Sequence, residues 1–145
     1  MTIQIILGSD HGGYDLKEAL KEGLSQNSEL TIEDIGTVST DSVDYPDIAD
    51  TVAQTVLAKN TVGILCCGTG IGISIRANRY KGIRAAVVYN EFTAEMSKKH
   101  NNANILCLGG RTTSPEDALK YVNIWLKHDF EGDRHLRRVK KLDVE

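Results

Sequence analysis

The stretch CCGTGIG, residues 66 to 72, holds the residues best suited to chemistry. It follows a β-branched run and precedes a segment with helical periodicity, which predicts a glycine-rich turn between a strand and a helix. Such a turn offers backbone N–H groups beside a helix N-terminus, where anions and thiolates are stabilised. The glycines alone fit equally well a tight turn that needs positive φ.

Familiar glycine and cysteine loops do not match this stretch. A dinucleotide-binding loop needs glycine at position 73, and a phosphatase-type loop with Cys67 as nucleophile needs arginine there, but the residue is Ile73. No Gly-Lys-Ser/Thr follows, as a Walker loop requires, and adjacent cysteines do not form a Cys-x-x-Cys redox pair. A thiolate acting as a base beside a bound anion remains as the hypothesis.

The two adjacent cysteines are predicted to differ in environment. Successive side chains of a strand point to opposite faces, so Cys66 and Cys67 do not share one. Cys67 lies nearer the loop and the coming helix, where a thiol pKa is lowered. Cys66 and Cys107, in NILCLGG, are interpreted as small buried hydrophobic residues.

The four histidines show no metal-binding spacing, so no metal is expected. His128 ends a predicted helix and is interpreted as a partner of the helix dipole. His100 stands in KKHNNAN, and the residues around it leave a structural and a catalytic role open. The other two histidines are His11 and His135.

The C-terminal segment RHLRRVKKL is predicted to be a basic helix. Arg134 and Arg138 are four residues apart and share one face, on which two planar guanidinium groups suit a phosphate. A solvated basic face is the alternative, and Glu131 and Asp133 supply nearby negative charge that fits it.

Alternating strand and helix patterns predict an α/β domain with a parallel sheet. The strands are expected at 3–7, 30–35, 62–67, 83–89 and 104–108. Helices are expected from about residue 14, at 45–59 with Pro46 in the first turn, near 72–80, at 91–99, at 115–127 and near 133–142. No linker, repeat or low-complexity stretch divides the chain, so residues 1–145 are expected to form a single domain.

Ligands of open parallel sheets bind at the carboxyl ends of the strands. The loops at 8–13, 66–72, 89–91 and 109–113 are therefore expected to build the site. The side chains there that can do chemistry are Asp10, His11, Cys67, Thr69 and Arg111.

The composition limits the function classes. With 17 basic and 20 acidic residues the net charge is −3, which disfavours a binder of nucleic acid or of acidic membranes. The N-terminus lacks a secretory pattern, no apolar run approaches the roughly 20 residues of a membrane span, and three cysteines do not suggest a disulfide framework. A reduced, cytoplasmic protein is expected.

Taken together in order, six motifs resemble those of the type B ribose-5-phosphate isomerases, within the wider family that holds the galactose-6-phosphate isomerase subunits. The motifs are Asp10-His11, DYPD at 44–47, CGTGIGISI at 67–75, HNNAN at 100–104, GGR at 109–111 and GDRHLRR at 132–138. The resemblance spans nearly the whole chain. It implies a three-layer α/β/α Rossmann-like fold, no cofactor, and a homodimer, sometimes paired into tetramers, with active sites at the subunit interface.

The implied reaction interconverts D-ribose 5-phosphate and D-ribulose 5-phosphate through a cis-enediolate, in the pentose phosphate pathway. By resemblance, Cys67 is the base between C1 and C2, Thr69 and loop N–H groups hold the enediolate oxygens, His100 opens the furanose ring, and Asp10 handles hydroxyl protons. The implied substrate-binding residues are His11, Tyr45, Gly68, Gly70, Ile71, Gly72, Asn101, Arg111, Arg134 and Arg138.

Some members of the family place a carboxylate base just beyond the glycine loop, where this chain has Ile73, which leaves Cys67 as the candidate base. Arg76 and Arg79 stand where relatives commonly have alanine and lysine, and DHGG replaces the more usual DHAG. Three alternatives stay open: an isomerase of a six-carbon sugar phosphate such as allose 6-phosphate or galactose 6-phosphate, a phosphosugar-binding module without turnover, and a nucleic-acid contact through RHLRRVKK.

Overall fold

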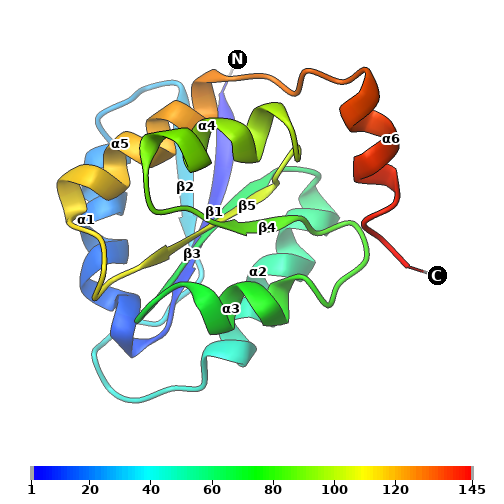
Figure 1. The fold of residues 1–145 in the computed structure, drawn as a ribbon. Helices are drawn as coiled ribbons and strands as arrows, with labels where there is room; N and C mark the ends of the chain where they lie inside the picture. The colour runs from blue at the N-terminus through cyan, green and yellow to red at the C-terminus, as the bar shows by residue number, and fades with distance from the viewer. Residues whose placement is uncertain (1, 145) are drawn as a thin grey trace.

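Five parallel strands form one sheet at the centre of the protein, in a computed structural model that describes residues 2–144 (Figure 1). The order across the sheet is β2-β1-β3-β5-β4, and every neighbouring pair is parallel, as predicted. The strands are β1 Ile3–Ser9, β2 Leu30–Asp34, β3 Val62–Cys67, β4 Ala85–Val87 and β5 Ile105–Gly109.

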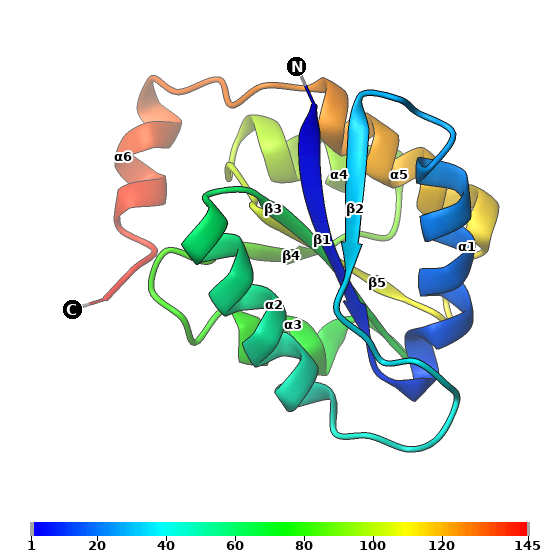
Figure 2. The same cartoon turned by 180° about the vertical axis from the view of Figure 1, so that it is seen from behind.

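Helices cover both faces of the sheet, which gives the expected three layers. One face packs against α1, α4 and α5, and the other packs against α2 and α3 (Figure 2). The helices are α1 Tyr14–Leu24, α2 Tyr45–Lys59, α3 Ile71–Ala77, α4 Glu91–Lys99, α5 Pro115–Lys127 and α6 Arg134–Lys140, with a short 3₁₀ turn, η1, at His11–Gly13.

Helix starts follow from local side-chain chemistry. The Asn90 side chain accepts a hydrogen bond from the Thr93 N–H at 2.7 Å and begins α4. Ser114 caps α5 in the same way, through the Asp117 N–H at 3.1 Å. Pro46 lies in the first turn of α2, as predicted, where its missing N–H costs no helical bond.

Two apolar clusters, one on each face of the sheet, make up the core. Ile64 and Cys66 of β3 belong to the cluster under α1 and α5, whereas Leu65 and Cys67 belong to the cluster under α2 and α3. The prediction that the adjacent cysteines face opposite ways is confirmed. Trp125 is completely buried in the first cluster, and its indole N–H donates to the Ala103 carbonyl at 3.1 Å.

The segment between α3 and β4 departs from the predicted boundaries. The helix expected near 72–80 is Ile71–Ala77, and the strand expected at 83–89 is only Ala85–Val87. The Asn78 side chain accounts for the end of the helix. Its amide donates to the Ala85 carbonyl at 2.9 Å and its oxygen accepts the Ala85 N–H at 2.7 Å, so Asn78 leaves the helix and occupies the outer edge of β4.

The last helix, α6, forms where a basic helix is predicted and stands apart from both helical layers (Figure 1). Its two ends are tied to the body: the Glu131 N–H donates to the Lys99 carbonyl at 3.0 Å, and the Asp143 carboxylate accepts the Gly82 N–H at 3.2 Å. Among residues 2–144, none of the helices combines the length and the apolar character needed to cross a membrane.

Candidate functional site

Three loops meet at the carboxyl ends of β1, β3 and β5. The strand registers place Ser9 beside Cys66 and Cys67 beside Gly109, so the loops that follow these strands start side by side. Backbone bonds join them further. The Asp10 N–H donates to the Cys66 carbonyl at 3.2 Å, and the Gly110 N–H donates to the Cys67 carbonyl at 2.7 Å.

Glycine is needed where these loops touch. A Cβ at Gly13 would lie 2.4 Å from the Cys66 carbonyl oxygen, and a Cβ at Gly110 would lie 2.5 Å from the Gly12 carbonyl oxygen. Both distances are shorter than any real carbon–oxygen contact between such atoms. The close approach of the three loops therefore depends on glycine at positions 13 and 110.

The Cys67 thiol lies under the glycine-rich turn. Its side chain is almost fully buried, and Sγ accepts a hydrogen bond from the Gly70 N–H at 3.1 Å. Gly70 has a φ of +82°, a left-handed conformation that lets its N–H face the sulfur. The Cys67 sulfur thus has a backbone donor from the glycine-rich turn.

The other two cysteines are unsuited to this role. Burial raises the pKa of the Cys66 thiol far above its usual range, and burial has the same effect on the pKa of Cys107. Both side chains are completely buried in the core, as predicted. Cys67 is therefore the thiol that lies at the loops.

Two side chains of the first loop are held in fixed positions. The buried Asp10 carboxylate accepts the Gly13 N–H at 3.1 Å, which starts the 3₁₀ turn. The Nδ1 atom of His11 accepts the Val43 N–H at 3.2 Å, so neutral His11 carries its proton on Nε2. That nitrogen is left as a donor.

Arg111, Tyr45 and Thr69 border the same turn. A Cβ at Gly68 would lie 3.0 Å from the Arg111 Nη1 atom, and one at Gly72 would lie 2.8 Å from the Tyr45 ring, so these side chains lie directly over the glycines. The exposed Thr69 hydroxyl accepts the Ile71 N–H at 3.2 Å and keeps its own proton to donate. Ile71 is exposed at the start of α3.

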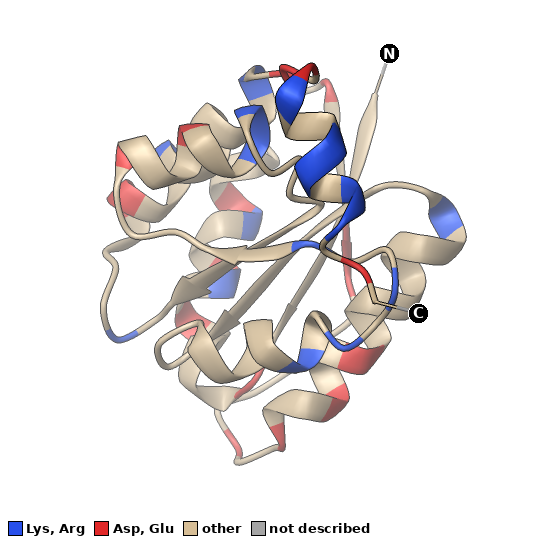
Figure 3. Ribbon diagram, turned by 45° about the vertical axis from the view of Figure 1, so that its right-hand side comes forward, with Lys and Arg blue, Asp and Glu red and all other residues tan. Residues whose placement is uncertain are grey.

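The remaining predicted residues lie at the opposite end of the sheet. His100 ends α4, and Asn101 follows it, so both precede β5 in the chain. β5 is about 13 Å long, and its far end, Gly109, is the residue that lies beside Cys67. Arg134 and Arg138 project from the nearby α6, which carries much of the basic charge in Figure 3. One chain therefore holds two separate groups of the predicted site residues.

The second group contains two residues that sequence reasoning did not place in the site. The ring of His135 stacks on that of His100, with centroids 4.1 Å apart and planes 14° apart. Glu131 Oε1 lies 3.6 Å from His100 Nε2 and 3.7 Å from His135 Nε2. The i, i+4 spacing of Glu131 and His135 could have predicted their contact. The contact of Glu131 with His100 could not be predicted in this way, because the two residues are 31 positions apart in the sequence.

His128 has a different partner. Its Nε2 atom lies 3.2 Å from Glu95 Oε1, which joins the end of α5 to α4. The predicted assignment to the end of a helix is confirmed, because His128 is the C-cap residue of α5.

Comparison with known proteins identifies relatives along the full chain. The model of the Ribose/Galactose Isomerase family matches residues 5–142. A ribose-5-phosphate isomerase B of Escherichia coli is 40% identical over 140 residues, which cover 96% of this chain and 93% of that protein.

Two solved structures show the same fold. A ribose 5-phosphate isomerase from Thermotoga maritima superimposes with a TM-score of 0.95 at 46% identity, with 99% of each chain covered. A ribose-5-phosphate isomerase B from Mycoplasma genitalium, with bound ribulose-5-phosphate, gives a TM-score of 0.93 at 41% identity, with 98% of this chain and 95% of that chain covered. The chain is therefore an isomerase that belongs to the ribose/galactose isomerase family, in its ribose-5-phosphate isomerase B branch.

Proposed function

We propose that this protein interconverts D-ribose 5-phosphate and D-ribulose 5-phosphate, as a step of the pentose phosphate pathway. The names of its relatives and the ribulose-5-phosphate in the Mycoplasma genitalium structure support this substrate. The observation that carries the proposal is the position of Cys67, whose sulfur lies beneath the glycine-rich turn with the Gly70 N–H 3.1 Å away.

In the proposed reaction, the Cys67 thiolate takes the proton from C2 of the open-chain aldose and leaves a cis-enediolate. The same thiol then returns a proton to C1 and gives the ketose. A well-placed base of this kind contributes about 10²–10⁴-fold to the rate. The steps use groups of the protein alone, without a cofactor.

The charge that develops on the substrate oxygens needs fixed donors nearby. Gly72 lies in the first turn of α3, where N–H groups have no acceptor within the helix, and the Thr69 hydroxyl stands beside it. One such donor contributes roughly 3 to 4 kcal/mol in a measured case. Asp10, which is buried at the neighbouring strand end, is the proposed group for transferring hydroxyl protons.

A complete site requires two chains in this proposal. His100, which opens the furanose ring, and Asn101, which holds a sugar hydroxyl, lie at the opposite end of the sheet from Cys67. A two-fold axis would place the second group of one chain over the loops of its partner and would make two equal sites. His11 and Arg111 of one chain, with Arg134 and Arg138 of the other, then bind the phosphate.

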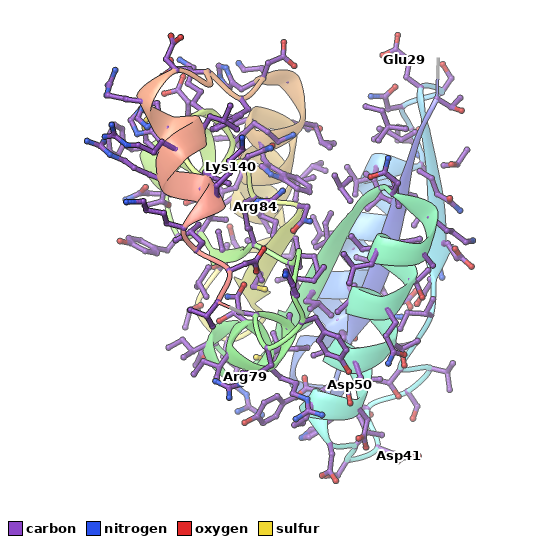
Figure 4. The ribbon with its side chains drawn as sticks, turned by 90° about the vertical axis from the view of Figure 1, so that its right-hand side faces the viewer. Glu29, Asp41, Asp50, Arg79, Arg84 and Lys140 are labelled. Carbon is purple, nitrogen blue, oxygen red and sulfur yellow. The ribbon has the colours of Figure 1, made fainter. Side chains whose placement is uncertain are left out.

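The surface near β4 supports a homodimer. Among residues 2–144, β4 has a neighbouring strand, β5, on one side alone, and the Asn78 side chain bonds to Ala85 on its other edge. A groove of ≈ 480 Å³ beside β4 is lined by residues that include Asn101 and Leu142. Figure 4 views the molecule from this side, with Arg84 before β4 and Lys140 on α6. Large apolar side chains are exposed on α3, at the end of β4 and on α4, namely Ile71, Ile75, Tyr89 and Phe92. A second copy of the chain would cover them.

The cellular setting follows from the same proposal. All three cysteines are free and buried, which supports a reducing, cytoplasmic location.

A coupled assay with ribose 5-phosphate and allose 6-phosphate side by side tests the proposed substrate. We expect turnover of the pentose and little turnover of the hexose, and faster hexose turnover would overturn the assignment. Binding of ribose 5-phosphate without entry of solvent deuterium at C1 or C2 would instead identify a binding module.

A further inference from the structure

We propose that His100, Glu131 and His135 form a binding site for a divalent transition-metal ion of the zinc class. Their three ligand atoms, two imidazole Nε2 atoms and one carboxylate oxygen, lie within 4.8 Å of one another. Two histidines and one carboxylate are a donor set that binds zinc in proteins and leaves a fourth position for water or another ligand.

The unpaired nitrogen of His135 is the second observation that points to a ligand. His135 is nine-tenths buried, and among residues 2–144 no group forms a hydrogen bond with its Nε2. The Glu131 Oε1 atom, at 3.7 Å, is too distant for a hydrogen bond. A buried nitrogen without a partner is costly, and a metal ion between it and Glu131 would remove this cost.

The distances need only small changes. Bonds of about 2.0–2.1 Å in a tetrahedral zinc site place neighbouring ligand atoms roughly 3.3 Å apart. The two measured nitrogen–oxygen separations, 3.6 and 3.7 Å, are slightly longer. The side chains of His100 and Glu131 are 39% and 46% exposed, so they can rotate and open the stacked rings toward one ion. His135 supplies the fixed ligand.

The backbone already holds the three residues together. The Glu131 N–H donates to the carbonyl of Lys99, the residue before His100, at 3.0 Å. The His100 N–H donates to the Met96 carbonyl at 2.9 Å, and the His135 N–H donates to the Gly132 carbonyl at 3.0 Å. The end of α4 and the start of α6 are thus fixed before any ion binds.

The charges around the site set its strength. Burial and the neighbouring His100 lower the pKa of His135. Arg134 and Arg138 lie on the same helix and oppose a cation. The two arginines make binding weaker than in a four-ligand structural zinc site, and they favour an anion in the fourth position.

An ion at this site would also stop the isomerase. This consequence rests on the proposed function, because it requires His100 to open the sugar ring, and a nitrogen bound to zinc cannot transfer a proton. Zinc is then a reversible inhibitor that competes with the sugar phosphate.

Titration of the metal-free, full-length protein with Co²⁺ tests binding without any need for activity. We expect one Co²⁺ per chain, the strong visible absorption of tetrahedral cobalt, and displacement by Zn²⁺. His135→Ala and the exposed substitution Glu131→Gln should each weaken binding at least tenfold, with circular dichroism confirming that both variants are folded.

One matched variant separates this site from other histidine ligands. His128→Ala removes the histidine paired with Glu95 and should bind Co²⁺ as the unchanged protein does. Absence of saturable binding, equal binding by Glu131→Gln, or loss of binding in His128→Ala would overturn the site.

Inhibition is measured separately. The Zn²⁺ concentration that halves ribose 5-phosphate turnover should rise at least tenfold in Glu131→Gln, relative to that variant's own activity. Unchanged inhibition would overturn the regulatory consequence. A protein with no isomerase activity would overturn the proposed function, while the Co²⁺ titration would still decide whether the metal site exists.

Discussion

The Gly70 N–H donates a hydrogen bond to the Cys67 sulfur at 3.1 Å. The bond joins the last residue before α3 to the last residue of β3, across the glycine-rich turn. It gives the sulfur of one of two adjacent cysteines a backbone donor at the loops, while burial raises the pKa of the other, Cys66, far above its usual range.

Replacement of Cys67 by alanine should reduce turnover of ribose 5-phosphate by about 10²–10⁴-fold, because the base is lost. Cys66→Ala is the matched control. It should keep near-normal turnover and lose about 1 kcal/mol of stability, as is typical of a buried substitution. Steady-state kinetics of both variants check the prediction, and normal turnover by Cys67→Ala with an inactive Cys66→Ala would show that the base is misassigned.

Replacement of Gly70 by alanine should lower both stability and turnover. The residue has a φ of +82°, and a Cβ there would lie 3.0 Å from the Leu108 carbonyl carbon, so strain of about 1–3 kcal/mol is expected. Gly82→Ala is the control, since Gly82 has a φ of +91° but meets only the flexible Leu57 side chain, at 3.1 Å. Thermal unfolding should show a loss for both variants, whereas only Gly70→Ala should lose turnover. Equal turnover in the two would argue against a role for the Gly70 N–H.

The buried ion pair between Lys17 and Asp34 should make the stability of the protein depend on pH. Lys17 is 1% exposed and donates to both Asp34 oxygens, at 2.8 and 2.7 Å. Burial opposes ionisation of Asp34, but the bonds from Lys17, the Gly36 N–H and Lys21 outweigh it and hold the pKa of Asp34 below its ordinary value. The stability from this pair is present above the unfolded pKa of about 4 and is lost as the pH falls through the lower folded pKa.

Asp34→Asn should therefore lose about 3 kcal/mol at pH 7, because Lys17 is left without its main partner, and should lose less additional stability in acid. Glu33→Gln removes the exposed ion pair with Lys59, while its amide oxygen can still accept the hydrogen bond from Gln4, so stability should change by less than about 1 kcal/mol. Urea unfolding between pH 7 and pH 3 measures both. An unchanged acid dependence in Asp34→Asn would exclude this pair as its source.

Much of the site could be predicted from the sequence, because the geometry of parallel strands determines where its residues lie. Alternation along β3 separates Cys66 from Cys67, and the parallel order brings Asp10, Cys67 and Arg111 to one end of the sheet. The outward reach of the Arg111 side chain over Gly68 depends on three-dimensional packing that no local pattern encodes.

Other features depend on contacts between distant segments. The stacking of His135 on His100 arises only when the segment after α5 folds back onto the end of α4. The early end of α3 depends on one side chain, Asn78, that bonds to the backbone of the edge strand at Ala85 instead of continuing the helix. Helical and strand periodicity carry no signal for either arrangement.

The central claim is that each active site combines Cys67 of one chain with His100 of another, and subunit mixing tests it most directly. Cys67→Ala and His100→Ala should each be nearly inactive as pure dimers. After unfolding and refolding together in equal amounts, half of the dimers would be mixed and would hold one intact site of two, so about a quarter of the unchanged activity should return. Full absence of recovery, with mixed dimers shown to have formed, would contradict a site shared between chains.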